Sequence, residues 1–239
     1  MTAEVNRAAH SKEEVVRVRD ELRRAANPRD GKLPRGATLR RLREKWLPQG
    51  LAICRNQAEG CEPSSCNNRC ASEYWLGHSE VVAALMRRMA ELAGDDPKLY
   101  ESTGLVHDLD YLRAPHDLGN RDVSAVHPLP LVRDLMALGA PPILSLAVLE
   151  HSPHLNLAPS SPLSEALVAC DDAATLASVD FEAMRRADLP PEIKEILIAK
   201  PPGRVAGKYR NGMARRMLRA FAALKTRKYH FPGAGRGGQ

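Results

Sequence analysis

Histidine and aspartate side chains recur through the middle of this 239-residue sequence, mostly at the ends of segments expected to be helices. Neutral imidazole and carboxylate are the usual ligands of iron, manganese, zinc and similar ions. Several helices that point such groups at one bundle interior can build a closed, rigid metal site. A single histidine is more often an ordinary core or surface residue, so it is the combined order that indicates a metal site. The candidate ligands, in chain order, are His78, His107, Asp108, His127, His151 and Asp171.

Proline, glycine and apolar spacing mark the helices that must carry these ligands. Val82, Leu85 and Met89 share one helical face. Gly94 is placed to end that helix, and His78 is expected to open it. No segment alternates convincingly between apolar and polar residues, so the sequence predicts an all-α helical bundle with an N-terminal helical extension. The expected helices cover residues 11–26, 37–46, 78–93, 97–109, 128–138, 141–151, 161–177, 180–187, 190–199 and 205–224.

The composition suits a globular protein built from helices. Hydrophobic residues make up 44% of the chain and aromatic residues only 4%, so aliphatic side chains must fill the core. No apolar run reaches the roughly 20 residues that a membrane helix needs, and the polar N-terminus lacks a secretory signal. We therefore expect a cytoplasmic protein with no membrane partner. Residues 46–193 carry 21 acidic and 10 basic side chains, which suits a cation site, whereas both flanking segments are basic.

The order of the candidate ligands, H…HD…H…H…D, resembles the HD-domain superfamily over about residues 72–180. The matching segments are GHSEVV, GLVHDLDY, VHPLPL, LEHSPH and ACDDAA. The resemblance implies an HD domain over 72–224, after a basic N-terminal extension over 1–71 and before a basic flexible tail over 225–239. It also implies one or two divalent ions, such as iron, manganese or cobalt. The implied core ligands are His78, His107, Asp108 and Asp171, joined in dinuclear members by His127 and His151.

The resemblance implies a metal-dependent phosphohydrolase that acts on a small phosphorylated metabolite or nucleotide through a metal-activated hydroxide. Asp108 would bridge two ions, as the aspartate of the family motif does. Asp110 or His154 could donate the leaving-group proton, although Asp110 could equally orient a ligand. His154 also competes with His151 for the ligand role. The candidate phosphate-binding residues are Arg113, Arg121 and Lys208.

Two other functions use the same sequence features. Some dinuclear HD proteins hold a mixed-valence di-iron pair and cleave C–C or C–P bonds with O₂. The six-ligand set and the gap of 19 positions between Asp108 and His127 keep this alternative open. The basic C-terminal segment could instead bind nucleic acid. We do not expect a nucleic-acid partner, because the aromatic side chains that stack on bases are nearly absent there.

Four cysteines precede the first candidate ligand. Their thiolates could bind Zn²⁺ tetrahedrally or hold an iron–sulfur cluster. They contain no Cys-x-x-Cys pair, so a second metal site and unbound thiols remain equal alternatives, and the HD resemblance does not cover them. These residues are Cys54, Cys61, Cys66 and Cys70.

Overall fold

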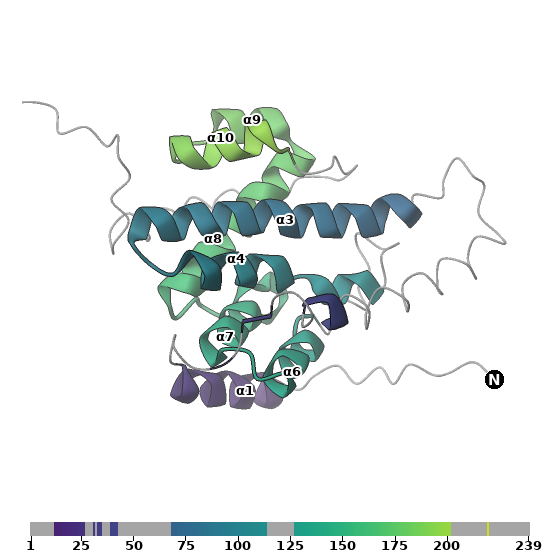
Figure 1. Ribbon diagram of the computed structural model, residues 1–239, viewed down its shortest axis with the longest axis vertical. Helices are drawn as coiled ribbons and strands as arrows, with labels where there is room; N and C mark the ends of the chain where they lie inside the picture. The colour runs from purple at the N-terminus through teal and green to yellow at the C-terminus, as the bar shows by residue number, and fades with distance from the viewer. Residues whose placement is uncertain are drawn as a thin grey trace, which may run out of the picture. The chain divides into compact units, whose positions relative to one another are not determined.

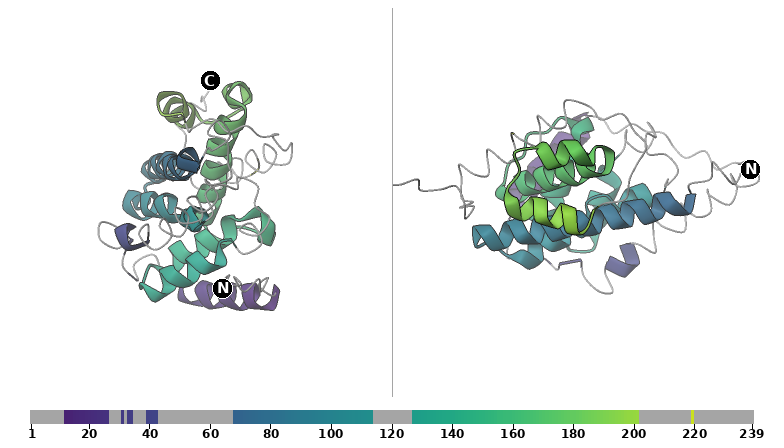
Figure 2. Two further views of the ribbon diagram at one scale, coloured as in Figure 1. Left: turned by 90° about the vertical axis from the view of Figure 1, so that its right-hand side faces the viewer. Right: turned by 90° about the horizontal axis from the view of Figure 1, so that it is seen from above.

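The protein is mainly helical in the part of the chain that its computed structural model describes, which is residues 12–26, 31, 33–34, 39–42, 68–113, 127–201 and 219. No strand occurs in these ranges (Figure 1, Figure 2). The prediction of an all-α fold is therefore confirmed. The chain divides into two compact units. The first comprises Met1–Leu76 with Val106–Ala158, and the second comprises Gly77–Leu105 with Pro159–Gln239.

Among the described residues, the main elements of the first unit are three α-helices and two short 3-10 helices. Helix α1 packs against α7, and α6 packs against both α7 and η1 (Figure 1, Figure 2). Helix α1 buries Val15, Val18 and Leu22, which lie on one face at helical spacing. The elements are α1 (Lys12–Ala25), η1 (Leu109–Arg113), α6 (Leu129–Ala137), α7 (Pro142–His151) and η2 (Pro153–Leu155).

Helix α7 forms the buried centre of this unit. Every residue from Leu144 to His151 is buried, as expected for a helix that is apolar around most of its circumference. Pro142 begins the helix, where a residue without an N–H costs no hydrogen bond. Gly139 takes the left-handed φ of 68° just after α6, a conformation that favours glycine at the end of a helix. The predicted ends at Gly139 and His151 are confirmed.

The second unit contains the longest helices that are described. Helix α9 packs against α8. Ser161 caps α8 by accepting a 3.1 Å hydrogen bond from the Ser164 backbone N–H. Asp180 caps α9 in the same way, accepting from Ala183 at 2.8 Å. The elements are α3 (Asn68–Ala93, in this unit from Gly77 onward), α4 (Pro97–Val106, in this unit to Leu105), α8 (Pro162–Val179), α9 (Phe181–Arg186) and α10 (Pro191–Ala199).

One helix starts well before its predicted position. The prediction that His78 opens a helix is wrong, because α3 begins at Asn68 and His78 lies within it. Residues 68–77 have no clear apolar periodicity, but Ala71 and Glu73 are good helix formers, and backbone hydrogen bonding needs no apolar face. The predicted end of this helix is confirmed by Gly94, whose φ is 69°. Residues 39–42 are helical, inside the expected 37–46 helix, whereas the expected 205–224 helix lies outside the described residues except at residue 219.

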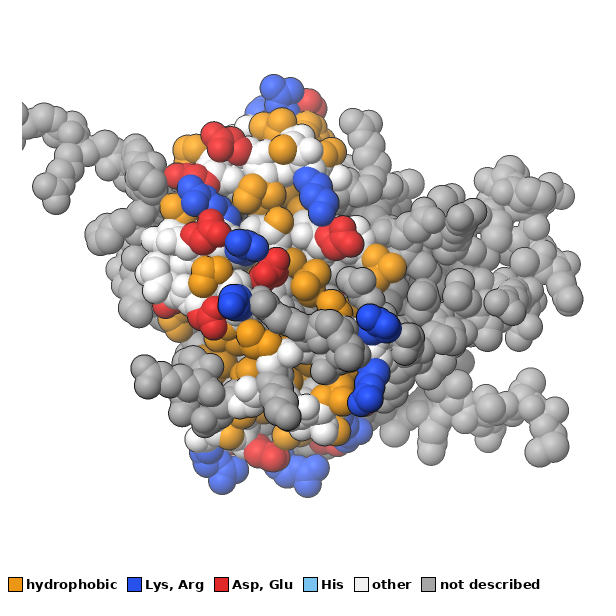
Figure 3. Space-filling model, in the orientation of Figure 1, with side chains coloured by type: hydrophobic (Ala, Val, Ile, Leu, Met, Phe, Trp, Pro, Cys, Tyr) orange, Lys and Arg blue, Asp and Glu red, His pale blue; other side chains and the backbone are white. Residues whose placement is uncertain are grey.

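The described surface mixes charge types. Figure 3 shows acidic, basic and apolar side chains interspersed on the face in view. Among the described residues, no helix combines the length and the apolar character needed to cross a membrane.

Helices α3 and α4 meet so closely at Gly104 that a larger residue has no room. A Cβ atom placed on Gly104 would lie 2.6 Å from the Cα of Ala83. We expect Gly104→Ala to destabilise the protein by about 1–3 kcal/mol, the usual cost of overpacking. Gly77→Ala is the matched control, because nothing lies within 4 Å of its Cβ position. Alanine at this helical site should stabilise the protein by up to about 1 kcal/mol. Thermal or urea unfolding of both variants checks the prediction, which equal stability of the two would contradict.

Candidate metal centre

Four predicted ligands of the first unit come together in its core. His107 and Asp108 form the turn between α4 and η1, His127 stands just before α6, and His151 is the last residue of α7. All four are buried, with at most 5% of any of them exposed. Segments up to 44 positions apart in sequence thus place three imidazoles around one carboxylate. A buried His/Asp cluster that could hold a metal ion is therefore present.

The donor atoms of three of these residues form a nearly regular triangle. Asp108 Oδ1 lies 3.2 Å from His151 Nε2 and 3.4 Å from His127 Nε2, and the two Nε2 atoms are 3.2 Å apart. Neighbouring ligands around a metal ion with bonds of about 2.0–2.1 Å are separated by about 3 Å, or slightly more in a tetrahedral site. The triangle therefore has the dimensions that an ion requires.

Hydrogen bonds on the far side of each ring determine which nitrogen faces the triangle. His127 Nδ1 lies 2.8 Å from the buried Asp110 carboxylate, and His151 Nδ1 lies 2.6 Å from the Val148 carbonyl oxygen. A carbonyl and a carboxylate only accept hydrogen bonds, so each Nδ1–H is the donor. In the neutral rings both Nε2 lone pairs consequently point at each other and at the Asp108 oxygen. Such an arrangement is stable only with a cation or a proton between the three atoms.

The two oxygens of Asp108 face different histidines. Oδ1 faces His127 and His151, whereas Oδ2 lies 3.3 Å from His107 Nε2. Burial alone would raise the pKa of the Asp108 carboxyl, but His107, His151 and His127 together hold this pKa well below its usual value. Asp108 is therefore a carboxylate across the neutral pH range. Each of its oxygens is available to a separate positive charge.

The two histidines of the triangle differ in their proton affinity. Burial lowers the pKa of His127, but the adjacent Asp110 carboxylate outweighs burial and raises this pKa above the ordinary value. Burial lowers the pKa of His151 below its ordinary value. Of the two rings, His127 therefore binds a proton more readily in the metal-free protein. The Tyr111 ring lies against His127, with centroids 4.4 Å apart.

The remaining two predicted ligands meet in the second unit. His78 of α3 and Asp171 of α8 approach to 3.0 Å between Nε2 and Oδ1. Thr175, one turn further along α8, donates a longer 3.4 Å hydrogen bond to the same carboxylate oxygen. His78 is almost fully buried, and 14% of the Asp171 side chain is exposed. Each unit therefore pairs imidazole with carboxylate independently.

The other predicted site residues take different positions or lie outside the described residues. Asp110 is fully buried and its carboxylate is hydrogen-bonded to His127, whereas His154 is exposed on η2. Arg113 belongs to η1, but its side chain is outside the described part of the chain. Cys70 belongs to the start of α3, and its side chain is likewise not described. Wholly outside the described residues are Arg121, Lys208, Cys54, Cys61 and Cys66.

Two features near the site were not predicted from the sequence. Tyr111 covers one face of His127, and Glu150, beside the candidate ligand His151, has a fully buried side chain. The sequence did offer a signal for Glu150, because it is the one acidic residue in the largely apolar helix PILSLAVLEH. Cys170, next to Asp171, is buried as expected for a small core residue, and this burial raises the pKa of its thiol.

Comparison with protein-family models, with curated proteins and with solved structures finds no match to this chain.

Proposed function

We propose that this protein is a metal-dependent phosphohydrolase of the HD type, with two divalent ions bridged by Asp108. The observation that carries the proposal is the division of the Asp108 carboxylate between two sets of histidines. Two-metal sites, with ions about 3.5–4 Å apart, are common in enzymes that hydrolyse phosphate esters. A single-ion site would leave either His107 or the His127–His151 pair without a role in ion binding.

The proposed centre lies in the first unit of the chain. Asp108 Oδ1, His127 and His151 would hold one ion. Asp108 Oδ2 and His107 would hold the other. The order of these residues in the sequence supports this assignment because it resembles that of the HD superfamily. Within the second unit, His78 pairs with Asp171 at 3.0 Å, which is the imidazole–carboxylate pairing that the same resemblance implies for these two residues.

Bound divalent ions would lower the pKa of water and offset the charge of a phosphate group. The role of the chain is to hold imidazole rings in the required tautomer. Asp110 does this for His127, because its Oδ1 accepts the Nδ1 proton and keeps Nε2 directed at the site. We therefore assign Asp110 the orienting role in preference to that of proton donor. His154, which is exposed, remains the candidate donor to a leaving group.

A di-iron oxygenase is the second candidate, because the same division of Asp108 suits a pair of irons. The discriminating experiment uses protein purified without oxygen and loaded with Mn²⁺ or Fe²⁺. Phosphate release is then measured under argon from aryl phosphates, nucleotides and sugar phosphates. The phosphohydrolase proposal expects turnover under argon. Turnover of an organic substrate only with O₂ and iron would favour the oxygenase. A loaded protein without either activity would contradict both.

Neighbouring histidines provide a matched pair of variants for the same assay. His151→Gln removes a proposed ligand, and we expect at least about a 100-fold loss of turnover, beyond the 10–100-fold typical of an outer partner. His154→Gln removes an exposed ring three positions later. It should retain metal binding and lose only the proton-donor contribution, which is about 100- to 10,000-fold. Metal analysis of both variants separates the two roles, and metal loss in His154→Gln would reassign the ligand.

A further inference from the structure

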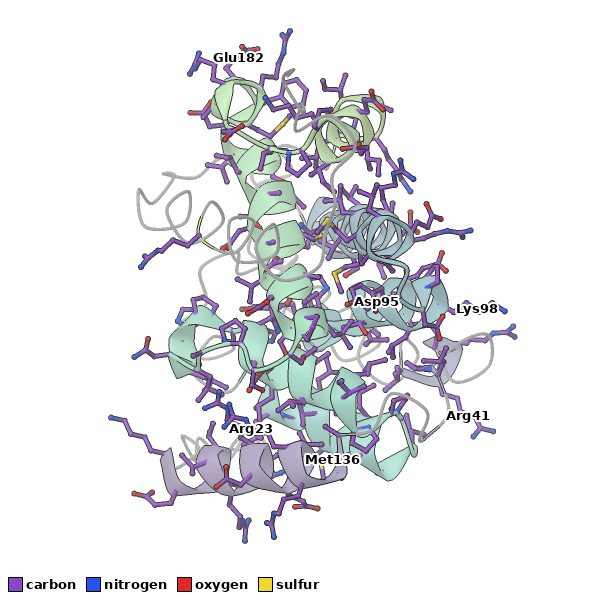
Figure 4. The ribbon with its side chains drawn as sticks, turned by 90° about the vertical axis from the view of Figure 1, so that its left-hand side faces the viewer. Arg23, Arg41, Asp95, Lys98, Met136 and Glu182 are labelled. Atoms are coloured by element: carbon purple, nitrogen blue, oxygen red, sulfur yellow. The ribbon has the colours of Figure 1, made fainter. Side chains whose placement is uncertain are left out.

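The N-terminal helix α1 contacts the segment that ends in the ligand His151. Glu150, the residue before this ligand, has a fully buried side chain, and Arg19 of α1 donates a 2.8 Å hydrogen bond to it from Nε. Arg23, one turn later on α1, has its Nε 3.7 Å from the same oxygen. Figure 4 shows Arg23 on the side of α1 that faces the rest of the unit. A buried carboxylate one residue from a ligand is thus neutralised by a helix outside the HD resemblance.

Arg19 also holds the chain beyond the ligand. Its Nη2 donates to the backbone carbonyl of Ala158, so one guanidinium contacts the residues on both sides of the segment 151–157. His151 is the last residue of α7, and its ring is oriented by the carbonyl of Val148, which lies in the last turn. Any displacement of this turn would therefore move both the ring and the carbonyl that selects its tautomer.

We propose that Arg19 is a positioning residue for the metal centre, acting through Glu150 on His151. This inference rests on the proposed function for the identity of the ligand set. The guanidinium keeps the Glu150 charge directed toward α1 and fixes the last turn of α7, so that His151 Nε2 stays in the donor triangle. Without Arg19, the buried Glu150 carboxylate next to His151 would lose its 2.8 Å hydrogen bond, and this loss would favour rearrangement of that turn.

A second ion pair of α1 supplies the control. Arg133 of α6 contacts Glu14 of α1, so it also holds α1 in place, but neither residue adjoins a ligand. Arg133→Met should loosen the attachment of α1 without leaving a charge beside His151. A purely structural role of α1 predicts equal effects from Arg19→Met and Arg133→Met, whereas the positioning role predicts different ones.

The first test measures the affinity of the full-length, metal-free chain for Mn²⁺ alone. We expect Arg19→Met to weaken the ion held by His127 and His151 by about 10- to 100-fold, the usual effect of losing a partner outside the ligand shell. Arg19→Met with Glu150→Gln, which removes both charges, should return to within about threefold of the wild type. Arg133→Met should also stay within that limit. The proposal is overturned if Arg19→Met stays within threefold, if Arg133→Met loses as much, or if the double variant shows no recovery.

The second test determines which ring nitrogen of His151 is protonated in the absence of metal. Imidazole ¹⁵N spectra of the wild type should show His151 protonated at Nδ1, as its contact with Val148 requires, with the signal assigned by its loss in His151→Gln. Arg19→Met should populate the other tautomer, and Arg133→Met should not. Unchanged spectra of Arg19→Met would overturn the proposal. A wild type that binds no Mn²⁺ would instead contradict the proposed function, while these spectra still decide the role of Arg19.

A variant that keeps the charge covers the case in which Arg19→Met does not fold. Arg19→Lys retains a cation beside Glu150 but cannot contact Glu150 and Ala158 together in the way that the planar guanidinium does. Its expected loss of Mn²⁺ affinity is about 3- to 10-fold, below that of losing the partner entirely. A smaller loss than threefold would overturn the proposal.

Discussion

Asp108→Asn should lose both metal ions, with affinity for each reduced by more than about 100-fold. That loss exceeds the 10–100-fold expected for a residue outside the ligand shell, because the variant removes the only charge that both ions are proposed to share. Asparagine keeps the shape of the side chain, so the change isolates the carboxylate. Metal analysis by mass spectrometry should find about two ions per wild-type chain and none in the variant after dialysis.

Single-ligand variants make the prediction for Asp108 sharper. His151→Gln should lose one ion and His107→Gln the other, because each is assigned to a different oxygen of Asp108. Glu182→Gln is a suitable control, since Glu182 lies on α9 with 63% of its side chain exposed and pairs with Arg185 three residues later. An Asp108→Asn protein that still holds one ion tightly would contradict the bridging role.

Asp108→Asn should also change the thermal stability of the metal-free protein. The pKa of Asp108 is held below its usual value in the folded protein, so its carboxylate stabilises the fold at pH above its unfolded pKa. This contribution disappears as the pH falls through the depressed folded pKa. Metal-free Asp108→Asn should therefore melt below the wild type at neutral pH, and the two melting temperatures should converge in acid. Convergence on the alkaline side instead would contradict this assignment.

Local signals in the sequence predict most of the fold and part of the site. Pro142 fixes the backbone φ at the start of α7, and Gly139 permits the left-handed φ that ends α6, so these two helix ends follow from residue type alone. The place of His151 at the end of α7 follows in turn. The start of α3 could not be predicted from apolar spacing, because residues 68–77 propagate the helix without an apolar face.

Long-range pairing lies beyond such local signals. Arg19 and Glu150 are 131 positions apart, and nothing in either local pattern specifies the partner. Glu150 by itself indicates only that some cation must compensate a charge inside an apolar helix. Similarly, the contact of Asp110 with His127 depends on how η1 and α6 pack, so the sequence left its orienting role and its acid role open.

The proton on His127 should compete with metal and make binding steeply dependent on pH. Asp110 raises the pKa of this ring in the metal-free protein, so below that raised pKa an ion must displace the proton from Nε2. We expect the affinity of the ion held by His127 and His151 to fall by up to about tenfold for each pH unit below this pKa. Titration calorimetry in buffers of different ionisation enthalpy, from about pH 5.5 to 8.5, should detect the released proton.

Asp110→Asn tests the cause of this dependence. Without the neighbouring carboxylate, burial is opposed less strongly, with Asp108 still acting against it, so the pKa of His127 should fall and the metal-free ring should lose its proton at lower pH. The fall of metal affinity at acidic pH should therefore begin at a lower pH. At high pH the affinity falls by about 10- to 100-fold, because the asparagine accepts the Nδ1 proton more weakly and orients the ring less firmly. An unchanged pH dependence of metal affinity in acid would show that another group carries the competing proton. An unchanged affinity at high pH would show that Asp110 does not orient His127.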